Sequence, residues 1–131
     1  MPVGTPDWSR LVRPEKPFVG RGQTVKVYFT ATRVSAGSNQ TVRMFTVGAG
    51  KKLALSSGVI SVEHSCIQRV DYMPMGVTTM VMVFDMNYQL IDSDIGTAIF
   101  GEGQYLDLKI YNNDTSDRTF YITLWGQEED V

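Results

Sequence analysis

The residues best suited to chemistry are one histidine and one cysteine that lie two positions apart. His64 and Cys66 fall in a stretch expected to be strand, so their side chains share one face. A histidine can activate a cysteine as a nucleophile, but the pair needs a third group to orient it, and the sequence assigns none. A structural zinc ion takes four ligands, usually Cys or His, and the chain has only these two. We therefore favour a buried thiol beside an ordinary histidine, and expect no enzyme, no metal and no cofactor.

Two kinds of loop offer ligand-like residues. The glycines around Lys51 suggest a phosphate loop, but that motif needs Gly where position 45 has Phe, and Ser or Thr where position 52 has Lys. Calcium takes six to eight oxygen ligands, and two acidic loops could supply some: Asn112, Asn113, Asp114 and Asp117 in one, Asp92 and Asp94 in the other. Their spacing does not fit the twelve-residue helix–loop–helix pattern. We favour ordinary turns, with calcium binding as the alternative.

Aromatic side chains could form a sugar-binding face, because their rings stack on the apolar faces of sugars. Tyr121 and Trp125 lie four residues apart on a predicted strand and so share one side of it. Aromatic residues more often cover the edge of a core or an oligomer interface. Glycan binding by Tyr121 and Trp125 is therefore a secondary hypothesis.

Composition indicates one domain with no general affinity for polyanions. The 131 residues fit a single domain, and 43% hydrophobic residues is normal for a globular protein. A net charge of −2 gives no overall attraction to nucleic acid or to an anionic membrane. A single cysteine excludes an internal disulfide, and the first residues lack the pattern of a secretory signal. We expect folding in the cytosol and no partner among nucleic acids or membranes.

Residues 1–22 differ in composition from the rest of the chain and predict an extended arm. Four of the five prolines lie here, which excludes a helix or a central strand. The segment nevertheless carries apolar and cationic residues that a solvated linker would not need: Trp8, Leu11, Val12 and Phe18, with Arg10 and Arg13. We expect these six residues to bind a partner.

From residue 23 to residue 126 the pattern predicts many short strands and no helix. Val25, Val27 and Phe29 share one face of a strand, with Lys26 and Tyr28 on the other. Residues 56–58 interrupt a third strand that resumes at 59–64, and Gly58 could mark a bulge or bend there. The apolar stretch at 77–86 is typical of a strand buried on both faces. Eight or nine strands at this spacing predict an all-β, antiparallel β-sandwich of the jelly-roll kind. Residues 127–131 are expected to form an acidic tail.

The stretch from 103 to 126 organises the predicted sandwich. Leu106, Leu108 and Ile110 share one face of a first strand, and the six polar residues at 112–117 form a turn. Phe120, Ile122 and Leu124 then share one face of a second strand. Two such strands joined by a polar loop predict a central hairpin.

Two segments resemble small jelly-roll proteins of tailed-phage virions. FTVGAGKKLAL at 45–55 is similar to their strand entry, in which a Gly-Lys turn leads into a long apolar strand. GEGQYLDLKIYNNDTSDRTFYITLWG at 101–126 is similar to their closing hairpin. Together the two segments cover about a third of the chain. The resemblance implies a virion structural component, such as a capsid decoration protein, and brings no catalytic residues with it.

We therefore expect a capsid decoration or cement protein, located in the virion and assembled in the host cytoplasm. Its arm would bind the major capsid protein or another virion protein, and the apolar anchors would contribute more than the cations. The acidic residues at 128–130 are candidate partners for the arm if the protein is a homo-oligomer, with a trimer expected by analogy with virion jelly rolls. The alternative is a carbohydrate- or receptor-binding jelly-roll module of a phage tail or fibre.

Overall fold

The computed structural model describes residues 23–63, 67–84, 88–91 and 99–131 and shows nine strands there. In chain order they are β1 (Gln23–Val34), β2 (Asn39–Thr46), β3 (Lys51–Val62), β4 (Gln68–Pro74), β5 (Met80–Phe84), β6 (Tyr88–Ile91), β7 (Ile99–Phe100), β8 (Tyr105–Tyr111) and β9 (Arg118–Asp130). The predicted arm, the His64–Cys66 pair, Asp92 and Asp94 lie outside the described residues. Within the described ranges no helix has the length and apolar character needed to cross a membrane.

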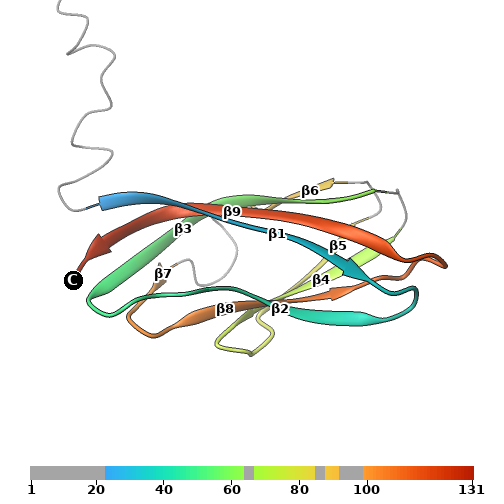
Figure 1. Cartoon of the computed structure of the whole chain (residues 1–131). Coiled ribbons are helices and arrows are strands. Elements are labelled where there is room, and N and C mark those ends of the chain that lie inside the picture. Colours follow the sequence, from blue (N-terminus) through green and yellow to red (C-terminus); the bar gives the residue numbers. More distant parts are fainter. Residues whose placement is uncertain (1–22, 64–66, 85–87, 92–98) are drawn as a thin grey trace, which may run out of the picture.

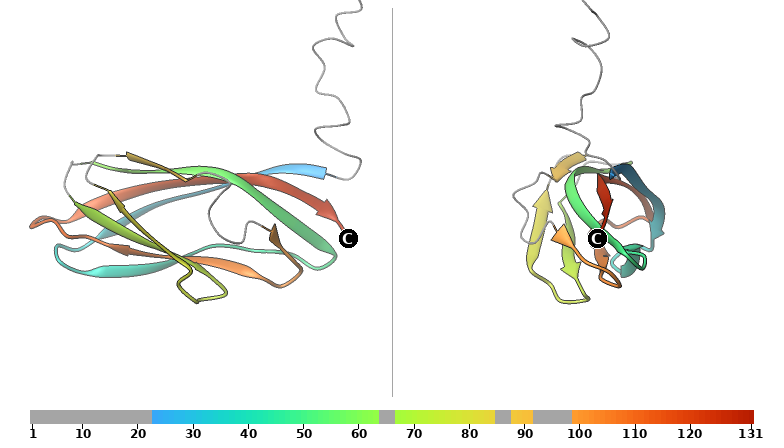
Figure 2. Two further views of the ribbon diagram at one scale, coloured as in Figure 1. Left: turned by 180° about the vertical axis from the view of Figure 1, so that it is seen from behind. Right: turned by 90° about the vertical axis from the view of Figure 1, so that its left-hand side faces the viewer.

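The strands form two antiparallel sheets that pack face to face (Figure 1). The β1 sheet has the order β1-β9-β3-β6, with β7 also paired to β3, and the β2 sheet has the order β2-β8-β4-β5. The end-on view in Figure 2 shows the two layers on either side of one interior. Most consecutive strands alternate between the two sheets, which is the connectivity of a jelly roll. The predicted fold class is confirmed.

The core consists of the inward-facing side chains of both sheets. The two apolar rows predicted around the 112–117 loop are fully buried: Leu106, Leu108 and Ile110 on β8, and Phe120, Ile122 and Leu124 on β9. Burying a side chain of this size stabilises the fold by roughly 1.5–3 kcal/mol. These two rows therefore make a large contribution to holding the sheets together.

The predicted central hairpin is wrong, although its two strands and their buried faces are right. β8 pairs with β2 and β4, whereas β9 pairs with β1 and β3. The loop at 112–117 therefore carries the chain from one sheet to the other. A period of two shows which side of a strand is apolar, but it does not show which strand is its neighbour.

The prediction that residues 77–86 form a strand buried on both faces is also wrong. Within the described part of this stretch, which ends at residue 84, β5 spans Met80–Phe84 and lies at the edge of the β2 sheet. Met82 and Phe84 are buried, but Val81 and Val83 are 46% and 63% exposed. A sheet of a sandwich has one face toward solvent, so an apolar run in it need not be buried on both sides.

Register shifts in β3 and β2 change which side chains of these strands face the core. β3 continues through the predicted interruption at 56–58, with a register shift between Leu55 and Ser57 against β9. A second shift on β2, against β8, leaves both Met44 and Phe45 buried. An extra residue in one strand lets alternation resume on the other parity.

The segment expected to be an acidic tail is mostly strand. β9 continues through Asp130, between β1 at the edge and β3. Its acidic residues pair with lysines of these neighbours: Glu128 with Lys26 (Nζ–Oε1 3.8 Å), Glu129 with Lys52 (2.9 Å) and Asp130 with Lys51. These carboxylates are therefore already engaged within the sandwich, which weakens their candidacy as partners for the arm.

Candidate binding surfaces

The six arm residues predicted to bind a partner all lie in residues 1–22, which the structure does not describe: Trp8, Arg10, Leu11, Val12, Arg13 and Phe18. Their role stays a prediction. The described sandwich begins at Gln23, the first residue of β1. The arm is therefore joined directly to the edge strand of the β1 sheet.

The predicted glycan-binding residues belong to an exposed apolar surface. Tyr121 and Trp125 lie on the outer face of β9, where Tyr121 is 42% exposed and Trp125 is partly exposed. Three apolar side chains of the adjacent edge strand extend this surface: Val25, Val27 and Phe29, which are 58%, 63% and 61% exposed. Val27 lies directly opposite Trp125 in the register. We call these five residues the β1–β9 face.

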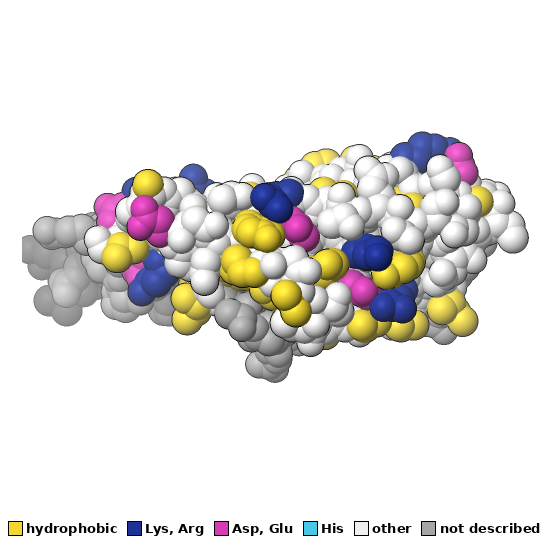
Figure 3. All heavy atoms as spheres, turned by 90° about the horizontal axis from the view of Figure 1, so that it is seen from below, with side chains coloured by type: hydrophobic (Ala, Val, Ile, Leu, Met, Phe, Trp, Pro, Cys, Tyr) yellow, Lys and Arg dark blue, Asp and Glu magenta, His cyan; other side chains and the backbone are white. Residues whose placement is uncertain are grey.

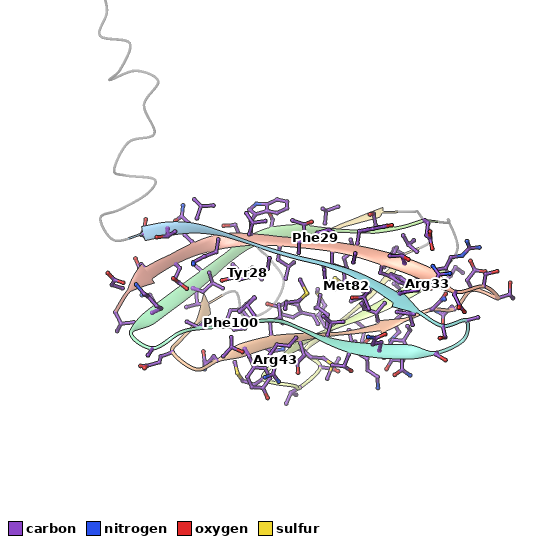
Figure 4. The ribbon with its side chains drawn as sticks, in the orientation of Figure 1. Tyr28, Phe29, Arg33, Arg43, Met82 and Phe100 are labelled. Carbon is purple, nitrogen blue, oxygen red and sulfur yellow. The ribbon has the colours of Figure 1, made fainter. Side chains whose placement is uncertain are left out.

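The β1–β9 face arises because the usual polarity of an amphipathic strand is reversed on β1. The even positions of β1 point inward and are largely polar, and the hydroxyls of Thr30 and Thr32 form a hydrogen bond of 2.7 Å there. The ring of Tyr28 packs on that of Phe45, with centroids 4.8 Å apart, and its burial raises its pKa. Figure 4 shows Tyr28 directed between the layers and Phe29 directed away from them. The apolar row of β1 therefore faces solvent.

Charged pairs border the β1–β9 face at both ends. At one end Arg33 Nη1 lies 3.6 Å from Glu63 Oε1. At the other end Lys52 Nζ lies 2.9 Å from Glu129 Oε1, and Gln23 Nε2 donates to Glu129 Oε2 at 2.9 Å. The hydrogen bond from Gln23 and then the contact with Lys52 lower the pKa of Glu129. On the outer face, each of these pairs thus places one cation and one anion at its end, and the five residues of the face are uncharged.

The outer face of the β2 sheet has a different character. Two arginines are each held by a carboxylate and a tyrosine ring: Arg43 by Asp107 (2.8 Å) and Tyr105 (3.8 Å to the ring centre), and Arg69 by Asp71 (2.8 Å) and Tyr111 (4.5 Å). Figure 3 views the molecule from this side and shows basic and acidic side chains next to one another among apolar ones. This surface is mixed in character, and its arginines are fixed in place.

Internal hydrogen bonds occupy the loop at 112–117, the described candidate for calcium binding. Asn112 is buried, and its Nδ2 donates to the carbonyl oxygens of Val34 and Ser116, each at 2.9 Å. Its Oδ1 accepts from the backbone N–H of Asp114 at 2.9 Å, and Asp114 Oδ2 accepts from Arg118 Nε at 2.7 Å. No group of three or more potential metal ligands occurs among the described residues. The loop geometry therefore favours a structural role.

The β1–β9 face has the composition of a protein-binding surface, with an apolar, partly aromatic centre and charged ends. The sequence shows that Val25, Val27 and Phe29 share a face and that Tyr121 and Trp125 share another. Only the pairing of β1 with β9 makes these two rows one surface. The pattern within β1 gives the opposite expectation, because the side that carries Val25, Val27 and Phe29 is the more apolar one.

Comparisons with known proteins show the fold. No family model and no curated protein sequence matches the chain. Among solved structures, a chain of the capsid asymmetric unit of cyanophage Pam1 matches with a TM-score of 0.54 and 12% identity, over 97% of this chain and 99% of that one. A chain from the disulfide-linked pili of Bacillus endospore appendages matches with a TM-score of 0.44 and 6% identity, over 83% and 90%. The first likeness supports the same arrangement of strands over nearly the whole of two chains of similar length.

Proposed function

We propose that this chain is a structural protein of a bacteriophage particle, which decorates the capsid and stabilises the shell. The observation that carries the proposal is the likeness of fold, nearly end to end, to a chain of a cyanophage capsid asymmetric unit. That match leaves almost no part of either chain uncovered, so a chain with a similar arrangement of strands occurs in a capsid asymmetric unit. A role in architecture needs surfaces for binding, and this sandwich provides two of distinct character.

The proposed attachment to the shell is through the arm at residues 1–22. It carries Trp8, Leu11, Val12 and Phe18 as apolar anchors, with Arg10 and Arg13 beside them. Twenty-two residues in an extended conformation span at most about 70–80 Å, which is enough to cross a neighbouring subunit. Aromatic anchors in desolvated pockets commonly dominate interface energies, so the anchors should contribute more than the two arginines. The proposed partner is the major capsid protein or another virion protein.

Co-sedimentation with capsids that lack this protein tests the proposal. We expect the full chain to sediment with the capsids, and a chain lacking residues 1–22 to stay in the supernatant. Replacing Trp8, Leu11 and Phe18 together with alanine should have the same effect, whereas Ser9→Ala is the matched control within the arm and should bind normally. Urea unfolding of each variant shows whether the sandwich is intact. Undiminished sedimentation after the deletion would exclude the arm as the attachment.

A second candidate function, recognition of a carbohydrate or receptor at a phage tail or fibre, rests on the exposure of Tyr121 and Trp125. On the β1 side, the β1–β9 face flanks these aromatics with Val25, Val27 and Phe29, which offer no hydrogen bonds to sugar hydroxyls. That composition favours a protein partner. Binding to a glycan array that is lost in Tyr121→Ala and Trp125→Ala would support the second function, and an array without signal from the intact chain would count against it.

A further inference from the structure

The β1–β9 face is an apolar surface that the domain does not use for its own core. We propose that a second copy of this chain packs on it, face to face, about a two-fold axis. Four of its five side chains are 42–63% exposed. They present on the order of 400 Å² to solvent, within the roughly 300–600 Å² of the largest apolar patch on an ordinary monomer, which is often functional. A standard interface covers about 800 Å² on each partner, so this patch would form its centre.

The register of the β1 sheet gives this surface an internal symmetry. Tyr28 on β1 lies opposite Leu124 on β9, which lies opposite Gly58 on β3. A two-fold axis that lies parallel to the sheet and crosses the strands at this row would place Val27 of one copy against Phe29 of the other. An isologous contact of this kind uses the same residues twice, as closed dimers do.

The same axis brings opposite charges together at the ends of the surface. The axis crosses β9 at Leu124. Lys52 lies opposite Glu129, which comes five positions after Leu124. Val62 lies opposite Phe120, which comes four positions before Leu124. Glu63 follows Val62 and is therefore five positions from the axis on the other side. Lys52 and Glu63 are thus equally far from the axis on opposite sides. The rotation places Glu63 of each copy over Lys52 of the other.

The edge strand has the same complementarity. Arg33 lies five positions after Tyr28 and Gln23 lies five positions before it. The rotation therefore places Arg33 of one copy over Gln23 of the other, beside Glu129. Each end of the dimer would hold two cations and two anions, which favours this orientation over one that superposes like charges. This self-complementary arrangement, together with a net charge of only −2, indicates a second copy as the occupant.

Light scattering on a sizing column tests the pairing with the full-length chain. We expect twice the monomer mass of 14.6 kDa at micromolar concentration. Val27→Asp places a carboxylate at the centre of the contact and should return the mass to that of the monomer, with the dissociation constant raised roughly 100-fold or more. Val83→Asp is the matched control, because Val83 is also 63% exposed but lies on the other sheet. It should leave the mass of the dimer unchanged.

Charge reversal distinguishes this two-fold from other ways of associating. Lys52→Glu alone and Glu63→Lys alone should each weaken the dimer about tenfold or more, and the double variant should recover most of the loss. Lys52 lies near the start of β3 and Glu63 directly follows its end, a separation of eleven positions or roughly 35 Å, so they cannot contact each other within one chain. Repulsion inside each chain is present in monomer and dimer alike. Recovery therefore reports contact between copies.

A monomer, a trimer, or a double variant as weak as the single ones would overturn the proposed two-fold. The inference does not rest on the role in the virion, because the isolated chain suffices for the measurement. A dimer of the predicted symmetry that fails to bind capsids would refute only the proposed function. A monomer that binds capsids would refute only the pairing.

Discussion

Replacing Asn112 with alanine should destabilise the connection that carries the chain from the β2 sheet to the β1 sheet. The Nδ2 of Asn112 donates to the carbonyl oxygens of Val34 and Ser116, and its Oδ1 accepts from the N–H of Asp114, all at 2.9 Å. Gln68 Nε2 donates to the same Oδ1 at 3.3 Å. Alanine removes these four hydrogen bonds at a position that is 1% exposed.

The size of the loss follows from these contacts. A net hydrogen bond contributes about 0.5–1.5 kcal/mol, and a buried polar group left without its partner costs about 1–3 kcal/mol. The three bonds at 2.9 Å therefore predict a loss of roughly 2–4 kcal/mol, with water replacing part of what is removed. A domain of this size has a total stability of about 5–15 kcal/mol, so the change should be easy to measure.

Urea unfolding followed by circular dichroism measures this loss. The midpoint should fall while the dependence on urea stays the same, as expected when only stability changes. Asn113→Ala is the matched control, because the Asn113 side chain is exposed and only its backbone N–H binds Gln68. The control should shift stability by less than about 0.5 kcal/mol. A loss below about 1 kcal/mol for Asn112→Ala, or one equal to the control, would refute the structural role of this amide.

Two further predictions follow from the β1 sheet. A Cβ at Gly126 would overlap backbone atoms of β3, so Gly126→Ala should lower the free energy of unfolding in urea by about 1–3 kcal/mol or more. Gly48→Ala is the control: a Cβ there would lie 4.0 Å from its nearest neighbour, so this variant should be nearly neutral. Because Gln23 and Lys52 lower the pKa of Glu129 below its ordinary 4.5, the stabilisation from that carboxylate is present above pH 4.5 and is lost as pH falls through the lowered pKa. The difference in urea midpoint between wild type and Glu129→Gln should therefore disappear in acid, and a difference independent of pH would refute this linkage.

The sequence predicts the strands of this protein better than it predicts their neighbours. The alternation in Leu106–Ile110 and in Phe120–Leu124 identifies two buried rows, because side chains of a strand alternate between two faces. The same alternation is compatible with a hairpin or with a crossing between sheets. Total strand number and the even spacing of turns indicated a jelly roll, but pairing depends on contacts distant in sequence. The loop at 112–117 looks like a turn in either case.

The candidate site was harder to predict than the fold, because it depends on which side of β1 faces the core. Val25, Val27 and Phe29 form the more apolar side, and the usual expectation would bury that side. The inward side holds Tyr28, whose ring packs on that of Phe45. Local pattern alone does not decide between these two orientations. The pairing with β9, in which Leu124 must point inward, decides it.

The exposed row on β1 is best explained by what covers it in an assembled state. An outward valine that remains 63% exposed gains little from folding, so Val27 contributes little to the stability of the isolated domain. An apolar face on an edge strand twelve residues long is also a hazard, since such strands promote aggregation unless they are covered or charged. The charges at Arg33, Glu63, Lys52 and Glu129 border the row without interrupting it. A partner that matches both the apolar centre and the charged ends would turn this hazard into a specific interface, and a second copy of the same surface meets both requirements.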